Sequence, residues 1–233
     1  EARDILGRAE GFATAATEGP RDRVALGYFA TLGPTWLPGI VTALAAAMPG
    51  VETELRECDL EEVPRLLGTG MIDFALSYDV GLAPAVPRRV LAEIGAHALL
   101  PANHPLAKAP AVTLEALARH PFILIDLPMS RELLMVPFWN RGLSPEVRLR
   151  TRSVQTVHAM VAAGLGVSLL FTRRPTLADE AGRAAVWRAI DDETPVQRLI
   201  LARNPARTED ELARTFADTV ADEVSARLRP LRG

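Results

Sequence analysis

The sequence contains one cysteine, one lysine and no long hydrophobic run. Because Cys58 is the only cysteine, an intrachain disulfide, a cysteine zinc cluster and a two-cysteine peroxide switch are excluded. Lys108 is the only lysine, so positive charge comes from scattered arginines, and the formal net charge is −3. We therefore do not expect this chain alone to bind nucleic acid strongly.

Signals for membrane insertion and secretion are also missing. No apolar run approaches the roughly 20 residues that span a bilayer, and the amino terminus lacks a basic-then-apolar secretion signal. We expect a cytoplasmic protein, although a cleaved signal would leave no trace. The absence of an initiator methionine indicates that the chain begins inside a longer protein, or that its start was processed. Its 48% hydrophobic content is enough for one large or two small domains.

Residues 24–48 predict one buried strand followed by one helix. The apolar run 24–29 is typical of a strand buried on both faces, which favours a parallel sheet covered by helices. An apolar stripe from Trp36 to Met48 then predicts a helix. Thr31 lies between them, where unpaired backbone N–H groups favour an anion. It is either the helix cap or a ligand contact.

Strands and helices continue to alternate along the rest of the chain. Asp59 and Thr208 are predicted to cap the helices that begin there, and Gly164 is predicted to stop a helix. Further strands are predicted at 51–55, 72–78, 90–94, 97–100, 122–126, 147–152, 167–171, 186–190 and 196–202, and helices at 1–17, 59–67, 114–119, 132–140, 154–163 and 208–228.

The motifs that could indicate catalysis or metal binding are weak. Residues 163–166 superficially resemble a phosphate loop, but they follow a helix, whereas a dinucleotide fingerprint follows a strand. The four histidines show no metal-ligand spacing, and no hydrolase triad is supported. The arginines at 148, 150 and 152 share one face of a predicted strand and are interpreted as a solvated face.

Polar residues cluster at the ends of predicted strands and at one helix start. Segments 77–79 and 126–131 each follow a strand, and segment 153–156 begins a helix. Parallel sheets bind ligands at such positions. Each group could instead be a cap, with Asp126 or Ser130 capping one helix and Ser153 capping the next. Together with Thr31, facing each other across a gap between two domains, they favour a small polar ligand.

Several short motifs, in this order and spacing, resemble the effector-binding domain of LysR-type transcriptional regulators over essentially the whole chain. They are Gly27 with Leu37-Pro38, and segments 48–51, 66–76, 104–106 and 161–170. The resemblance implies an α/β fold with two periplasmic-binding-protein-like (type II) subdomains. Each would be a mostly parallel sheet flanked by helices, joined by two crossover strands. The implied boundaries are 22–96 with 201–230 for subdomain I, 97–200 for subdomain II and 1–19 for the end of a linker helix.

The same resemblance implies an effector cleft between the subdomains and an amino-terminal winged helix-turn-helix domain that is missing here. DNA would bind only through that missing domain. A homodimer or homotetramer is implied, with no cofactor, metal or membrane. Family position places these residues at the cleft: Thr31, Leu32, Cys58, Asp59, Ser77, Tyr78, Asp126, Met129, Ser130, Arg131, Ser153, Val154, Gln155 and Phe171.

Two departures from the family pattern bear on the effector. Ala30 replaces a serine that carboxylate-binding members often place beside Thr31, and Asp79 and Asp126 add acidity. The expected effector is therefore an organic acid, with a zwitterion or an amine-bearing acid favoured over a simple dicarboxylate.

Two rival functions use the same architecture. A transport solute-binding protein is disfavoured by the amphipathic leader helix and by the absent signal. An enzyme would need a preorganised acid, base or nucleophile, and no such group of residues is visible.

Overall fold

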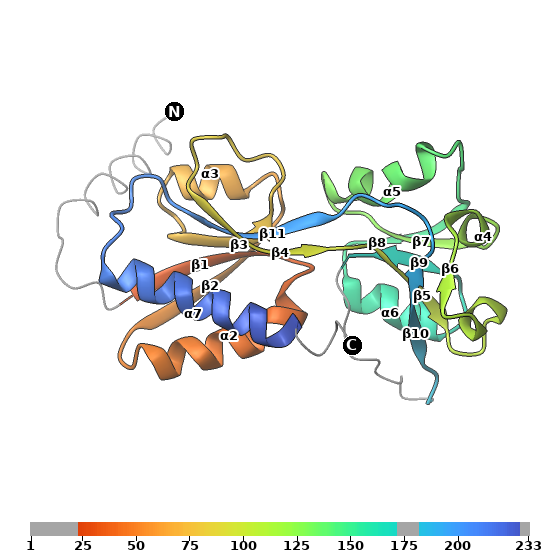
Figure 1. Cartoon of the computed structure of the whole chain (residues 1–233), viewed down its shortest axis with the longest axis horizontal. Helices are drawn as coiled ribbons and strands as arrows, with labels where there is room; N and C mark the ends of the chain where they lie inside the picture. Colours follow the sequence, from red (N-terminus) through yellow and green to blue (C-terminus); the bar gives the residue numbers. More distant parts are fainter. Residues whose placement is uncertain (1–22, 172–181, 229–233) are drawn as a thin grey trace, which may run out of the picture. The chain divides into compact units, whose positions relative to one another are not determined.

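The computed structural model describes residues 23–171 and 182–228, which form two compact units (Figure 1). In this range, unit 1 comprises residues 23–29, 36–92 and 199–228, and unit 2 comprises 30–35 and 93–198. Strands β4 (Arg88–Ile94) and β11 (Gln197–Arg203) contain the boundaries and pass from one unit to the other. They are the two crossover strands that were expected. The helix predicted at 1–17 lies outside the described residues.

Unit 1 is built on a five-stranded sheet with the order β2-β1-β3-β11-β4. Strand β1 pairs in parallel with β2 and β3, whereas β11 pairs antiparallel with β3. Helices α2 and α7 cover one face of the sheet, and α3 covers the other (Figure 1). The remaining bounds are β1 Arg23–Phe29, α2 Gly33–Ala47, β2 Glu52–Cys58, α3 Val63–Gly68, β3 Phe74–Tyr78 and α7 Glu211–Leu228.

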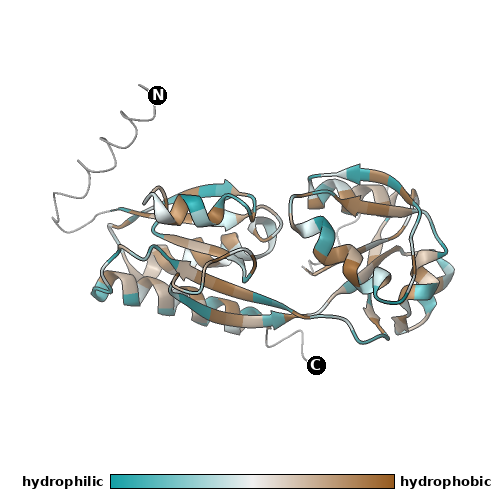
Figure 2. Ribbon diagram, turned by 90° about the horizontal axis from the view of Figure 1, so that it is seen from above, coloured by the Kyte–Doolittle hydropathy of each residue, from teal (hydrophilic) through white to brown (hydrophobic). Residues whose placement is uncertain are grey.

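Helices on both faces explain why all five residues of β3 are buried. The Phe74 ring stacks on Phe216 of α7 with centroids 4.6 Å apart. Helices α2 and α7 pack so closely that a Cβ on Gly39 would overlap the Glu223 carboxylate. The hydropathy colouring of Figure 2 shows the same pattern, with hydrophobic strands inside and hydrophilic residues on the outer helix faces.

A buried ion pair joins the start of β3 to the loop before α7. Arg207 Nη1 donates to Asp73 Oδ1 at 2.7 Å, and these side chains are only 3% and 12% exposed. The second carboxylate oxygen of Asp73 accepts from the Ala25 N–H at 2.9 Å. Arg207 also lies over the Phe74 ring, 5.6 Å from its centroid. This pair therefore ties three segments of unit 1 together.

Unit 2 contains a four-stranded sheet, β6-β10-β5-β9, and a two-stranded parallel sheet, β7-β8. A parallel bridge between Phe122 and Val167 connects the two sheets at their β7 and β9 sides. Helices α4, α5 and α6 follow β6, β7 and β8 in the chain. The bounds are β5 His97–Pro101, η2 Pro105–Lys108, β6 Ala111–Val112, α4 Leu114–Ala118, β7 Phe122–Ile125, α5 Ser130–Trp139, β8 Val147–Thr151, α6 Val154–Ala162, β9 Ser168–Leu170 and β10 Ala185–Ile190.

Two predicted helix caps are wrong, and the predicted helix stop is confirmed. Helix α3 begins at Val63, and the Asp59 N–H donates to the Glu62 carboxylate, so Asp59 does not act as its cap. Helix α7 begins after Asp210, whose carboxylate accepts from the Ala213 N–H at 2.7 Å in place of Thr208. Gly164 has φ +81° directly after the last residues of α6, as a helix stop requires.

Both units mix parallel and antiparallel strand pairs. In the four-stranded sheet of unit 2, the β10–β5 and β5–β9 pairs are antiparallel and only β10–β6 is parallel, so the expectation of a mostly parallel sheet is wrong for this sheet. Within residues 23–171 and 182–228, no helix is long and apolar enough to cross a membrane.

Candidate functional site

In unit 1, the predicted site residues lie at the carboxyl ends of parallel strands. Cys58 ends β2 and Tyr78 ends β3, and both strands pair in parallel with β1, so these ends share one sheet edge. Cys58, Ser77 and Tyr78 are buried, at 3%, 1% and 2% exposure, and Asp59 is half-buried. This is the edge at which parallel sheets bind ligands.

Cys58 belongs to the packing of this edge. Its Sγ donates to the Tyr28 carbonyl oxygen at 3.4 Å. Burial, followed by the nearby Glu62 carboxylate, raises the pKa of Cys58 to about 12. The thiol is therefore protonated at neutral pH and is a poor nucleophile.

Asp79 follows Tyr78 and does not leave a free negative charge. Arg88 Nη1 donates to Asp79 Oδ1 at 2.6 Å, with side-chain exposures of 18% and 11%. The acidity expected from Asp79 is thus neutralised within unit 1. The neighbouring Tyr78 ring packs edge-on against Phe29 at 5.8 Å between centroids.

Thr31 and Leu32 follow β1 and precede α2. Both are buried, at 7% and 0% exposure, so Leu32 is a core residue of the fold. The residue directly before α2 is Leu32, so Thr31 does not occupy the N-cap position.

In unit 2, four predicted site residues lie on the strained turn after β7 and on the first residues of α5: Asp126 and Met129 in the turn, and Ser130 and Arg131 in the helix. Met129 has φ 61° and ψ −32°, and it is the only non-glycine residue with positive φ among the described residues. The Ser130 N–H donates to the Pro128 carbonyl at 2.7 Å, which closes a three-residue γ-turn around Met129. Such strained turns concentrate at ligand-binding sites.

The start of α5 has no side-chain cap, so neither of the predicted caps, Asp126 and Ser130, acts as one. Arg131 Nη1 instead donates to Asp126 Oδ1 at 3.1 Å, and Arg131 Nη2 lies 2.9 Å from Glu132 Oε1. Arg150 Nη1 lies 3.6 Å from the other Asp126 oxygen. We call these four residues the β7–α5 charge cluster.

The β7–α5 charge cluster keeps both signs of charge. Glu132 raises the pKa of Arg131, and Arg131 lowers the pKa of Glu132, so both are ionised at neutral pH. The Glu132 side chain is 47% exposed, and a hydrogen bond from its own backbone N–H also lowers the pKa of its carboxyl. A half-exposed carboxylate of this kind can accept a hydrogen bond from an incoming N–H group.

Sequence reasoning placed Asp126 and Arg131 at the site but omitted Glu132 and Arg150. The parallel pairing of β7 and β8 sets Arg150 opposite Leu124, two residues before Asp126. The alternating arginines of residues 147–152 carry that signal, but alternation alone does not distinguish a solvated face from one that pairs with Asp126, because the register of β8 against β7 decides it.

The start of α6 forms the third predicted segment. Ser153 Oγ accepts from the Thr156 N–H at 3.3 Å, which confirms it as the helix cap, and it lies 3.2 Å from Gln155 Oε1. Gln155 is exposed, whereas Val154 and Phe171 are buried at 3% and 5%.

Among the described residues, no group of three or more His, Cys, Asp or Glu side chains could hold a metal.

Comparisons with known proteins agree on one family. The model of the LysR substrate binding domain matches residues 17–225. The uncharacterized HTH-type transcriptional regulator YnfL of Escherichia coli K12 is 30% identical over 125 residues, covering 52% of this chain and 42% of that protein. The chain spans about half the length of the curated relatives it matches.

Solved structures are similar over most of the chain. HinK, a LysR family transcriptional regulator from Pseudomonas aeruginosa, aligns with a TM-score of 0.82 and 29% identity, covering 96% of this chain and 77% of that chain. The C-terminal domain of a probable LysR family regulator from Rhodococcus sp. RHA1 aligns with a TM-score of 0.79 and 32% identity, covering 85% and 98%. These similarities confirm the predicted fold class.

Proposed function

Since the chain belongs to the LysR substrate-binding domain family, we propose that its two units are regulatory subdomains that hold a small effector between them. Subdomain I would comprise residues 22–96 and 201–230, and subdomain II residues 97–200. The chain is the effector-binding domain of a LysR-type regulator, and its relatives are transcriptional regulators rather than enzymes or solute-binding proteins. In the longer protein, an amino-terminal winged helix-turn-helix domain would bind DNA in the cytoplasm.

The β7–α5 charge cluster is the observation that carries the choice of effector. It places the Asp126 and Glu132 carboxylates each within 3.1 Å of the Arg131 guanidinium, beside the strained turn at Met129. A ligand with one carboxylate and one ammonium group can exchange with these internal pairs and keep every charge matched. We therefore propose a zwitterion or an amine-bearing organic acid, because a dicarboxylate would leave the acidic groups uncompensated.

Individual roles follow from this choice. Arg131 would bind the effector's carboxylate, and the half-exposed Glu132 carboxylate would accept from its ammonium group. The exposed Gln155 at the start of α6 would bind a further polar group. Thr31 and Ser77 would provide hydroxyl groups from the proposed subdomain I. A ligand that contacts both units would favour one arrangement of them, and this population shift would be transmitted to the DNA-binding domain.

Calorimetry with a panel of amino acids, amines and organic acids tests this proposal. We expect one or more zwitterions to bind, and Arg131→Ala to weaken the binding by about ten- to a hundredfold through loss of a charge-assisted hydrogen bond. Arg119→Ala is the matched control, since Arg119 is an exposed arginine of unit 2 that pairs with Glu115 on its own helix. Equal affinity in both variants would remove Arg131 from the effector site.

LysR regulators are typically oligomeric, and we propose that this domain forms a homodimer or, in the longer protein, a homotetramer. Strand β2 supports this, because it is an edge strand with Leu55 42% exposed. Exposed edges favour pairing with a second chain. Light scattering at tens of micromolar should report a dimer, and a monomer there would contradict the proposal.

A further inference from the structure

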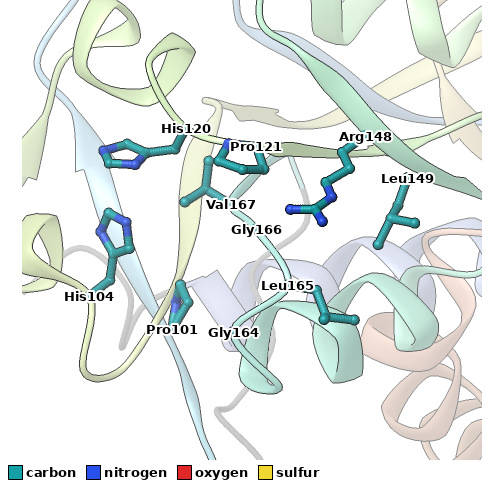
Figure 3. A pocket seen from close by; sticks show the side chains of 10 residues that line it. All are labelled: Pro101, His104, His120, Pro121, Arg148, Leu149, Gly164, Leu165, Gly166 and Val167. Carbon is teal, nitrogen blue, oxygen red and sulfur yellow. The ribbon is translucent and has the colours of Figure 1, made fainter.

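Unit 2 contains a pocket of about 370 Å³ that none of the predicted effector residues lines (Figure 3). It lies at the amino ends of β7, β8 and β9. Pro121 precedes β7, Arg148 lies near the start of β8, and residues 164–167 precede β9. The β7–α5 charge cluster and Ser153 follow the carboxyl ends of β7 and β8. The pocket is therefore a separate site at the opposite end of these strands.

The volume and lining of the pocket suit a small organic molecule. Its volume falls at the lower end of the range of ligand pockets, roughly 300–1,000 Å³. Apolar walls come from prolines and aliphatic side chains, including Pro101, Pro121 and Leu165. Leu165 is 48% exposed, although it is a large hydrophobic residue. The apolar part of a bound ligand would cover Leu165, and the burial of this apolar surface would favour binding.

The polar groups of the pocket favour a negative charge. Its lining contains Arg148 and two histidines, His104 and His120, and no carboxylate. Arg148 makes no ion pair within the described residues, and its side chain extends toward residues 164–167 (Figure 3). This contrasts with Arg150 two residues later, which pairs with Asp126.

The two histidines add a hydrogen-bond donor that is present even when the rings are neutral. Their rings meet edge-on with centroids 4.5 Å apart. The Leu106 N–H donates to His104 Nδ1 at 3.2 Å, so the proton of the neutral His104 ring lies on Nε2. Burial, together with His120, lowers the pKa of His104, which keeps this ring neutral at pH 7.

The wall opposite Arg148 is held rigidly in place. A Cβ on Gly166 would lie 2.4 Å from the Pro121 carbonyl oxygen, so only glycine fits this approach. The Val167 N–H donates to the same oxygen at 2.9 Å. At the end of α6, the Gly164 and Leu165 N–H groups satisfy two helix carbonyls at 2.8 and 3.1 Å, which reduces the negative charge near the pocket. A preformed site loses little free energy to ordering when it binds.

We propose that this pocket binds a small organic monocarboxylate, with the carboxylate on Arg148 and the apolar body between Pro101, Pro121 and Leu165. This ligand is additional to the proposed effector, and α6 runs from Ser153 to the pocket, so one helix touches both sites.

Backbone amide NMR with benzoate as the probe tests the proposal. Benzoate should shift the amides of Leu165, Gly166 and Val167. Benzamide, which has the same shape without the charge, and inorganic phosphate, which lacks the apolar body, should each bind at least about tenfold more weakly. Benzoate shifts confined to residues 153–155, or phosphate binding as tightly as benzoate, would overturn it.

Variants separate this pocket from the proposed effector site. Arg148→Met should weaken benzoate binding by about tenfold or more, because it removes a charge-assisted hydrogen bond from an exposed strand position. Arg119→Met removes the same charge elsewhere on unit 2 and should leave benzoate affinity unchanged. Arg131→Ala should also leave benzoate affinity unchanged, even though it weakens effector binding. Unchanged affinity in Arg148→Met would refute the site.

Discussion

Charged side chains serve different purposes in the two units. In unit 1, the Asp73–Arg207 pair is enclosed, with exposures of 12% and 3%, and it fixes loops to the sheet. In unit 2, the Asp126–Arg131 pair is open to solvent, with exposures of 28% and 47%. An enclosed pair can be broken only at a large cost, whereas an exposed pair can exchange one partner for a ligand. The enclosed Asp73–Arg207 pair thus serves stability, whereas the open Asp126–Arg131 pair can bind a ligand.

Substitution of Asp73 should have the largest effect on stability. Asp73→Ala leaves the Arg207 guanidinium buried without its counter-ion and should lower the free energy of unfolding by about 3–5 kcal/mol. Urea denaturation followed by circular dichroism measures this loss. Asp218→Ala is the matched control, because Asp218 pairs with Arg89 at the surface of the same unit. Similar losses of unfolding free energy in both variants would show that enclosed and open ion pairs contribute equally to stability.

The reactivity of Cys58 tests whether side chains at the carboxyl ends of the unit 1 strands are shielded from reagents. With a pKa of about 12 against an ordinary 9.0, its thiolate fraction near neutral pH falls about a thousandfold. Iodoacetamide should therefore modify the folded chain far more slowly than the chain unfolded in urea. Because the folded pKa is raised, the associated stability is present below about pH 9 and is lost as the pH rises toward 12. Rapid alkylation of folded protein would contradict this.

Asp79 should give an intermediate effect, because its partner keeps other bonds. Arg88 also donates to the backbone carbonyls of Ala83 and Val86. Asp79→Ala should therefore cost about 1–3 kcal/mol in the same urea experiment. A loss equal to that of Asp73→Ala would mean that the remaining hydrogen bonds of Arg88 do not reduce the cost.

Arg131→Ala should give the smallest change in stability. The side chain lies at the surface, and Asp126 retains Arg150 as a partner after the substitution. We expect the urea midpoint to be indistinguishable from that of the wild type, even though effector affinity falls. A clear shift of the midpoint would indicate that the β7–α5 charge cluster is structural.

The sequence predicted the order and type of most described elements, because most have a clear apolar period. The short elements η2 and β6 were not predicted, since two to four residues are too few to show one. Apolar run 24–29 became β1, and the apolar stripe of 208–228 became α7. Helix starts were less predictable. At α3 and α7, several acidic residues precede the helix, and tertiary packing decides which of them meets a free N–H group.

Interactions between distant residues account for what the sequence did not predict. Asp73 lies inside a recognised motif, but its partner Arg207 is 134 residues away. His104 and His120 both sit beside prolines in loops, yet only the folded chain brings their rings together. The positive φ of Met129 has no signal in its residue type, because the surrounding hydrogen bonds impose it.

The path of β4 and β11 makes unit 2 an insertion within unit 1. Apart from residues 30–35, unit 2 is one continuous stretch of the chain. The chain leaves unit 1 along β4 and returns to it along β11. These two strands are neighbours in the sheet of unit 1, so the two ends of the insertion emerge side by side, at a strand spacing of roughly 4.8 Å. Unit 2 is therefore a cassette that could be exchanged between related regulators without rebuilding the core of its host.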